Sequence, residues 1–355
     1  SPYRYNWQTP ILLSPHNQDI LYMAANKLLR SMDKGENFEV ISGDLTTGGK
    51  KGNVPFGTIA TISESPFQFG MIYTGSDDGL IQLTKDGGVT WSKISDDLPQ
   101  GLWVSRVIAS QHEKNRVYAT LNGYRSDDFK AYAYVSEDMG NTWKSIANGL
   151  PDYSINVIKE DPTDENLLYL GTDNEVYVSF DKGQNWQVFS HGIPKVAVHD
   201  LVIQEREKDL IIGTHGRSLY KANIATLQQN KTVALFKLPE TRHSSRWGNS
   251  WSQFSKPYLP NIEVSYFTSN AGTVKLEVLA DEKNVLYSET LKTDSGFNFT
   301  NYDVSVSEKS LKSYFGKKKI ELKKADNGKC YLPKGEYLLR LTSGNVSVTE
   351  KLVVK

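Results

Sequence analysis

The sequence predicts an all-β protein in which a series of β-propeller blades is followed by a small β-sandwich. Three observations favour this fold. A short motif recurs four times at the spacing of one four-stranded blade. Strands of alternating apolar and polar residues flank each copy. Alternation returns near the C-terminus after a segment of different composition. We therefore expect blades over residues 1–224, a linker over 225–258 and a sandwich over 259–355.

The repeated motif is Ser/Thr-x-Asp-x-Gly-x-x-Trp/Phe, called the Asp box below. Its four Asp residues are 53, 52 and 43 positions apart, which is the length of one blade. The motif residues are Ser31, Asp33, Gly35, Phe38, Thr84, Asp86, Gly88, Trp91, Ser136, Asp138, Gly140, Trp143, Ser179, Asp181, Gly183 and Trp186. One such motif would be weak support for a propeller, but four at this spacing are strong.

The residue types in the Asp box indicate a turn rather than a catalytic site. Ser, Thr and Asp side chains bond to backbone N–H groups of their own loop. Glycine accepts the positive φ needed where the chain reverses, and the aromatic ring is large enough to wedge between sheets. Four carboxylates in separate blades lie too far apart to act as an acid–base pair, which requires less than about 10 Å. We expect these residues to be structural, with weak cation binding as the alternative.

The regions beside the boxes read as β-hairpins. Strand pairs such as 71–74 with 80–83 and 167–170 with 176–178 are joined by turns of Asn, Asp and Gly. A fifth unit follows at 196–221 without a box. Because open sheet edges tend to pair with other strands, five units predict the C-terminal blades of a larger propeller. We expect the remaining blades to come from an N-terminal segment or from another chain.

These residues resemble a known family. Four Asp boxes in a blade context are similar to the sortilin-type and sialidase-type (BNR) repeat propellers. The segments 4–10, 41–46, 103–106 and 214–218 more closely resemble large bacterial sortilin-like BNR-repeat proteins, and 332–341 resembles the closing hairpin of their C-terminal domain. The resemblance covers most of residues 1–224. It implies an extracytoplasmic protein, secreted, periplasmic or on the cell surface, in a group where a glycosyl hydrolase label often rests on the repeats alone.

The C-terminal part predicts an immunoglobulin-like or fibronectin type III-like sandwich. Strands at 262–267, 274–279 and 335–341 alternate well, and 346–354 completes a terminal hairpin. The preceding run, 243–254, alternates aromatic with small polar residues. We interpret it as a linker whose aromatics pack on the domains. The alternative is a stacking platform for a sugar or peptide that includes Trp247 and Trp251.

Composition excludes several classes of function. Lys+Arg and Asp+Glu both number 41, so no excess positive charge favours nucleic acid or an anionic membrane. No run approaches the roughly 20 apolar residues of a membrane span. The only cysteine, Cys330, excludes an intrachain disulfide and is interpreted as a buried thiol. We expect no cofactor and no metal.

Candidate chemistry is sparse. Asp77, Asp78, Asp127 and Asp128 lie in turns between strands and are candidate ligand contacts at a propeller rim, although Asp is also an ordinary turn residue. His199-Asp200 and His215 are weighed as a metal or nucleophile site, against the simpler interpretation of packed or surface residues. We assign no catalytic residue.

The sequence is therefore interpreted as a non-catalytic scaffold that binds protein or peptide through propeller loops in an extracytoplasmic assembly. The alternative is part of a carbohydrate-active propeller protein, either glycan-binding or similar to a glycoside hydrolase. Fold alone does not decide between the two.

Overall fold

The computed structural model describes residues 3–49, 56–229, 232–252, 254–317, 319–320 and 322–355. The chain folds into two compact units, Ser1–Ile224 and Ala225–Lys355. Each unit is built almost wholly from antiparallel strands, which confirms the predicted all-β class. No helix within the described residues is long and apolar enough to cross a membrane.

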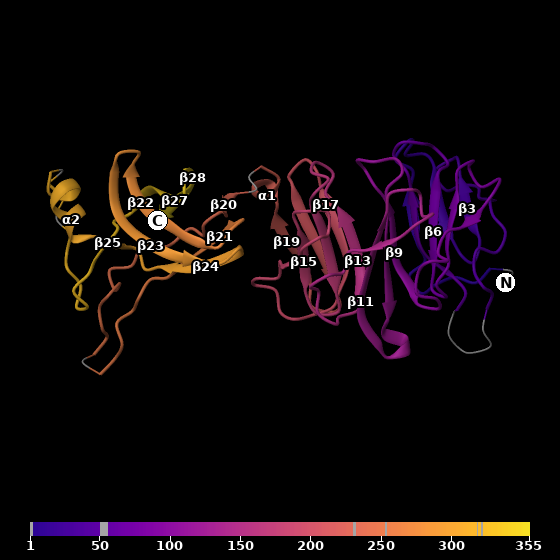
Figure 1. The fold of residues 1–355 in the computed structure, drawn as a ribbon. Coiled ribbons are helices and arrows are strands. Elements are labelled where there is room, and N and C mark those ends of the chain that lie inside the picture. Colours follow the sequence, from indigo (N-terminus) through magenta and orange to yellow (C-terminus); the bar gives the residue numbers. More distant parts are fainter. Residues whose placement is uncertain (1–2, 50–55, 230–231, 253, 318, 321) are drawn as a thin grey trace. The chain divides into compact units, whose positions relative to one another are not determined.

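Unit 1 consists of five sheets that follow one another in chain order (Figure 1). The first four are four-stranded meanders, as the Asp-box spacing predicts. Their strands are β1 Ile11–Leu13, β2 Leu21–Ala24, β3 Leu28–Ser31 and β4 Glu39–Val40; β5 Ile59–Glu64, β6 Ile72–Ser76, β7 Ile81–Thr84 and β8 Ser92–Lys93; β9 Trp103–Ala109, β10 Val117–Gly123, β11 Asp128–Ser136 and β12 Lys144–Ser145; β13 Ile155–Glu160, β14 Leu168–Thr172, β15 Val176–Ser179 and β16 Gln187–Val188. The fifth sheet has β17 Val198–Gln204, β18 Asp209–Thr214 and β19 Leu219–Asn223. A 3-10 turn, η1 Tyr124–Ser126, joins β10 to β11.

Each Asp box forms the turn between the third and fourth strands of its blade. In the third blade, the Asp138 carboxylate accepts hydrogen bonds from the Ser136 hydroxyl (2.7 Å) and the Thr142 amide (2.9 Å). The Ser136 hydroxyl in turn accepts from the Gly140 amide at 2.7 Å. Gly140 has a backbone φ of 88°, which residues other than glycine rarely adopt. The carboxylates are thus used within their own turns.

The box aromatics join neighbouring blades. The indole N–H groups of Trp91, Trp143 and Trp186 donate to the backbone carbonyls of Ile41, Ile94 and Ile146, each in the preceding blade. The three bonds are 3.2, 2.7 and 2.6 Å long. These box aromatics therefore lie between neighbouring sheets, as the motif predicts.

Unit 2 packs two antiparallel sheets on one apolar core. The three-stranded sheet orders β20 Val233–Leu235, β21 Ile262–Thr268 and β24 Gly296–Tyr302; the four-stranded sheet orders β23 Asn284–Thr293, β22 Gly272–Asp281, β27 Gly335–Ser343 and β28 Val346–Val354. A short ladder pairs β25 Ser305–Val306 with β26 Cys330–Tyr331. The helices are α1 Ala225–Gln229, α2 Glu308–Ser310 and the π-helix η2 Leu311–Gly316. The terminal hairpin has the predicted strands, while the immunoglobulin-like or fibronectin-like topology stays a prediction.

Residues 225–258, expected as a linker, are part of unit 2. Strand β20 hydrogen-bonds to β21, and Trp247 is only 3% exposed in the core of the unit. Burial removes these apolar groups from water, which stabilises the segment as part of the unit. Cys330 is buried, and burial raises the pKa of its thiol.

Candidate functional site: a cavity at the bulged first strands of unit 1

The first strands of successive blades, β1, β5, β9, β13 and β17, contact one another. Four of them carry an extra residue at the same place. The pairing register with the second strand slips around Ala60 in β5, Ser105 in β9, Asn156 in β13 and His199 in β17. A β-bulge bends its strand and redirects side chains, and bulges are common beside functional sites.

The four bulges line one cavity, called the channel cavity below, of about 380 Å³. Polar and aromatic side chains on its wall are Trp103, Ser105 and Arg106 of β9, Asn156 of β13, and His199 and Asp200 of β17. Gln8 and residues of β1 and β5 complete the wall. Side chains from distant parts of the sequence therefore meet at one place.

An ion pair between two blades lies on the wall of the channel cavity. Arg106 Nη2 lies 2.8 Å from Asp200 Oδ1, and the two side chains are 30% and 56% exposed. At this exposure the pair contributes little to stability, about 1 kcal/mol or less. Its effect is to place one cation and one carboxylate side by side on the cavity wall.

A chain of amides orients the next part of the wall. The Asn122 side-chain amide donates to Asn156 Oδ1, and the Asn156 amide donates to Asp173 Oδ1, both at 2.8 Å. The Ser105 hydroxyl donates to the Ile155 carbonyl at 2.7 Å. Because these groups are bonded to the scaffold, Ser105 and Asn156 are held in fixed orientations.

Two polar atoms on the wall have no hydrogen-bond partner within the described residues. They are Trp103 Nε1 and Arg106 Nε, both buried donors. An unpaired buried donor costs roughly 1–3 kcal/mol. An oxygen of a bound ligand would satisfy either group. The guanidinium of Arg125 stacks 4.4 Å from the centre of the Trp103 ring and so fixes the orientation of the indole.

His199 supplies an uncharged group. Burial, and secondarily His215, lowers the pKa of His199. The two rings are 5.3 Å apart. A lowered pKa favours the neutral imidazole, which has one donor and one acceptor nitrogen.

The four rim acids from the sequence analysis lie elsewhere. Asp77 is 3% exposed and accepts from both the amide and the hydroxyl of Thr58, each at 2.8 Å. Asp78 is 5% exposed and accepts from the Ser76 and Thr47 hydroxyls. Both carboxylates hold loops together and are not open to a ligand. Burial first, then Asp78, raises the pKa of Asp77.

Of the other predicted ligand contacts, some are exposed and others are buried or hydrogen-bonded within the protein. Asp127 is exposed in a turn with a φ of 55°. Asp128 accepts from the Tyr132 hydroxyl at 2.8 Å, which lowers the pKa of Asp128. Trp247 is buried and cannot stack on a ligand, whereas Trp251 is 82% exposed.

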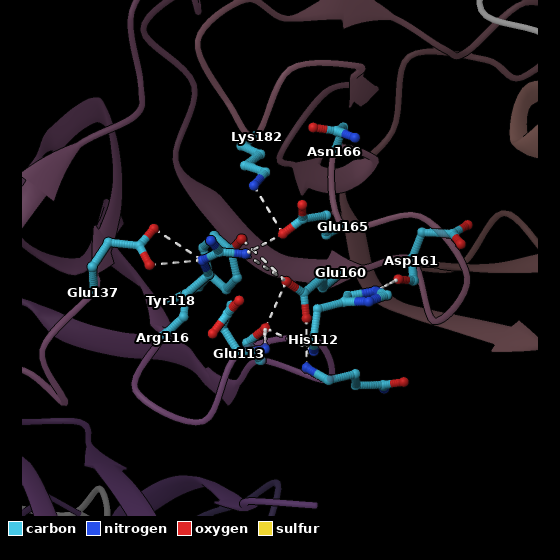
Figure 2. Close-up of polar contacts among 12 residues, drawn as sticks. His112, Glu113, Arg116, Tyr118, Glu137, Glu160, Asp161, Glu165, Asn166 and Lys182 are labelled. Carbon is cyan, nitrogen blue, oxygen red and sulfur yellow. Dashed lines mark hydrogen bonds and ion pairs between the residues drawn. The ribbon is translucent and has the colours of Figure 1, made fainter. Parts of the chain in front are cut away.

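A second polar cluster lies between the third and fourth blades (Figure 2). Arg116, whose side chain is 7% exposed, bonds to Glu137 at 2.9 Å and to Glu165 at 3.2 Å. Lys182 pairs with Glu165 at 2.8 Å, and Glu160 accepts from Tyr118 and from the Gln111 amide. These groups lie outside the channel cavity, and Arg116 and Lys182 form ion pairs with the surrounding carboxylates. We interpret this cluster as a structural tie between blades.

The sequence analysis missed Trp103, Ser105, Arg106 and Asn156 as site residues. A usable signal was present, since adjacent polar pairs, Ser105-Arg106 and His199-Asp200, interrupt the alternation of otherwise apolar strands. Such an interruption is typical of a bulge. His199 and Asp200 were weighed, but as a metal or nucleophile site. Among the residues described here, no group of three or more His, Cys, Asp or Glu side chains has metal-binding geometry.

Fold and site together define a propeller-type protein with a ligand-sized cavity at the bulged first strands of its blades. The family model described as "Sortilin, neurotensin receptor 3" matches residues 131–326, more than half of the chain. The chain belongs to this Sortilin-Vps10 family.

Comparisons also find enzymes. An oligoxyloglucan-reducing end-specific xyloglucanase from Emericella nidulans is 24% identical over 148 residues, covering 38% of this chain and 17% of that protein. Two solved structures, the GH74 xyloglucanase from Xanthomonas campestris and a GH74 enzyme from Niastella koreensis, each have a TM-score of 0.49 at 12% identity. In each, 99% of this chain aligns with 55% of the other. This chain thus spans under a fifth of the curated relative and about half of each solved structure.

The match to the xyloglucanase corrects the main functional interpretation of the sequence. A non-catalytic scaffold for protein or peptide was expected, but the curated relative is a glycoside hydrolase. The repeats were treated as uninformative about activity because Asp boxes are structural. The comparison favours the carbohydrate-active alternative instead.

Proposed function

We propose that the chain is part of a carbohydrate-active propeller protein of the glycoside hydrolase type, and that the channel cavity binds its glycan. The observation that carries the proposal is the meeting of Trp103, Arg106 and Asp200 at the bulged strands. The xyloglucanase relative supports the class of ligand.

The chemistry of the wall suits a sugar. Sugar rings have apolar C–H faces that contact aromatic rings and hydroxyls that both donate and accept hydrogen bonds. Trp103 Nε1 and Arg106 Nε are donors without a partner in the part of the chain that the structure describes. Asp200 and the neutral His199 supply acceptors. A hydroxylated ligand offers both acceptors for these donors and donors for these acceptors.

Hydrolysis requires more than this wall. Glycosidases generally use two carboxyl groups about 5–9.5 Å apart. Of the described residues that line the channel cavity, Asp200 alone carries a carboxylate. We therefore assign glycan binding to this cavity and Asp200 as its one candidate acid–base group, with the second carboxylate supplied from outside the wall.

A panel of neutral oligosaccharides, with xyloglucan fragments first, tests the proposal by calorimetric titration of the full chain. Trp103→Ala and Asp200→Asn are expected to weaken binding about tenfold or more, since stacking and charged hydrogen bonds each contribute on the order of 1–3 kcal/mol. Phe67→Ala, at a 47% exposed aromatic residue that lines neither the channel cavity nor any pocket of unit 2, is the control. Absence of binding to the whole panel, or full binding by Trp103→Ala, would overturn the assignment. Reducing-sugar release by the wild type and by Asp200→Asn tests hydrolysis separately.

We propose further that more blades adjoin the first one in an extracytoplasmic protein. Phe38, the box aromatic of the first blade, is 37% exposed, whereas its counterparts bond to a preceding blade. Ile11, Leu13 and Val40 of the same blade are 63%, 58% and 44% exposed. Native mass spectrometry of the protein from its source tests this, because additional blades would appear as added mass or a second subunit.

A further inference from the structure

Unit 2 carries two adjoining pockets that share Ser244 and Asn249. Their volumes are about 510 and 230 Å³. They are formed by the segments 243–252, 254–258 and 322–333, and together are called the basic pocket below. This surface lies in a different unit from the channel cavity.

The basic pocket combines aromatic faces with positive charge. Trp251 and Tyr258 are 82% and 57% exposed. Arg246 and Lys256 line the larger pocket, and Lys323 and Lys324 line the smaller one. No Asp or Glu is among the described lining residues, and none of these four cations forms an ion pair within the part of the chain that is described.

The loop that presents these groups is anchored. Asn249 accepts from the Asp326 amide, and Asp326 accepts from the Ser250 amide, at 3.0 and 3.1 Å. The Gly248 amide donates to the Tyr258 carbonyl at 2.7 Å. Beneath the loop, Trp247 is buried against Tyr331. Trp251 is therefore displayed from a fixed base, which lowers the entropy cost of binding.

Arg246 orients the stacking surface. Its guanidinium lies 5.0 Å from the centre of the Trp251 ring. The guanidinium therefore covers one face of the indole. A sugar ring stacked on the indole would lie close to this guanidinium. Guanidinium groups bind carboxylate and sulfate oxygens through paired N–H donors.

We propose that the basic pocket is a second glycan-binding site and that it takes an acidic polysaccharide, with carboxylate or sulfate groups on its sugar rings. The proposal rests on the carbohydrate role proposed above but uses different residues. Stacking on Trp251 and Tyr258 recognises the ring, and Arg246, Lys256, Lys323 and Lys324 recognise the charge. Ser244 and Asn249 line both pockets and so connect the two pairs of cations.

The test is native affinity electrophoresis of the full chain through gels containing polygalacturonate, a neutral glucan or single-stranded DNA. We expect retardation by polygalacturonate, weakened about tenfold in Trp251→Ala and in the double variant Lys323→Ala/Lys324→Ala. Lys292→Ala, an exposed lysine on β23, is the matched control and should behave as the wild type. Retardation should decrease as salt rises from about 50 to about 300 mM, because salt screens exposed charges.

Three results with the wild type or with Trp251→Ala would overturn the proposal. They are equal retardation by the neutral glucan, equal retardation by DNA, and full retardation of Trp251→Ala in polygalacturonate. Trp103→Ala distinguishes the two sites, because this variant should lose binding of neutral glycan and retain binding of polygalacturonate. Loss of polygalacturonate binding in Trp103→Ala would place acidic glycan in the channel cavity and so contradict the second site. If the wild type binds polygalacturonate but no neutral glycan, only the proposed function of the channel cavity is contradicted.

Discussion

The hydroxyl of Tyr118 donates a hydrogen bond of 3.2 Å to Glu160 Oε1, across the boundary between the third and fourth blades. Tyr22 makes the same bond, 3.0 Å long, with Glu64 between the first and second blades. Each tyrosine is the second residue of its blade's second strand, and each glutamate ends the first strand of the next blade. Tyr73 occupies the same strand position in the second blade, but the matching residue in the third is Ala109, and the Tyr73 hydroxyl has no partner within the described residues.

This contrast predicts opposite effects of the same substitution. Tyr118→Phe should lower the free energy of unfolding by about 1.5 kcal/mol, because it removes a hydrogen bond to a buried carboxylate. Tyr73→Phe should be neutral or stabilising, since it removes a buried hydroxyl that bonds to nothing in the described residues. Urea unfolding followed by fluorescence measures both. Equal losses in the two variants would show that the hydrogen bond contributes nothing.

We expect the Asp boxes to make the stability of the fold decrease at acid pH. The Thr90 side chain and amide, followed by the Thr84 hydroxyl, lower the pKa of Asp86 from 3.8 to about 2. A lowered pKa means that the ionised carboxylate stabilises the fold above its ordinary pKa, and that this contribution is lost as pH falls towards 2. Asp86→Asn should therefore show a smaller decrease in melting temperature than the wild type between about pH 4 and pH 2.

Circular dichroism melts across this pH range measure the effect. Asp127→Asn, which removes an exposed carboxylate outside the boxes, controls for the loss of one negative charge. Parallel pH profiles for the wild type and Asp86→Asn would contradict the prediction.

We expect substitution of a box tryptophan to lower stability, and to lower it further when more of the side chain is removed. Trp143 Nε1 donates to the Ile94 carbonyl of the preceding blade at 2.7 Å. Trp143→Phe should cost about 1 kcal/mol through the lost bond, and Trp143→Ala about 3 kcal/mol or more, because the ring contacts are lost as well. Thermal unfolding of both variants tests this. Trp7→Ala, at an 82% exposed tryptophan, is the control and should change stability by less than about 0.5 kcal/mol.

Close approach of two blades predicts that Gly171 does not tolerate a side chain. A Cβ at this position would lie 2.7 Å from Cγ1 of Val157 and 2.7 Å from Cγ1 of Val198, the latter in the next blade. Gly171→Ala should cost about 1–3 kcal/mol by overpacking. A Cβ at Gly43 would meet nothing within 4 Å, so Gly43→Ala is the matched control. If Gly171→Ala unfolds at the same urea concentration as Gly43→Ala, the packing is looser than the structure shows.

The blades were predictable because their determinants are local. Ser136, Asp138 and Gly140 make the turn bonds of one box among themselves and their neighbours, and alternation sets which strand face is buried. The linker interpretation was less successful, since β20 and the burial of Trp247 depend on partners far along the chain, in β21 and around Tyr331. Asp77 and Asp78 show the same limit, because a turn residue becomes buried only when distant loops close over it.

The sequence by itself determined the repeat unit, the all-β class and the position of each Asp box, because each rests on residues within one blade. The tertiary structure alone decided the candidate site. Trp103, Asn156 and Asp200 belong to three different blades and meet only where bulged first strands converge. Pairing register between strands produces each bulge, and packing between blades brings the bulges together. A bulge leaves only a local interruption of alternation in the sequence, as at Ser105-Arg106, and the packing that brings the bulges of different blades together leaves no local pattern.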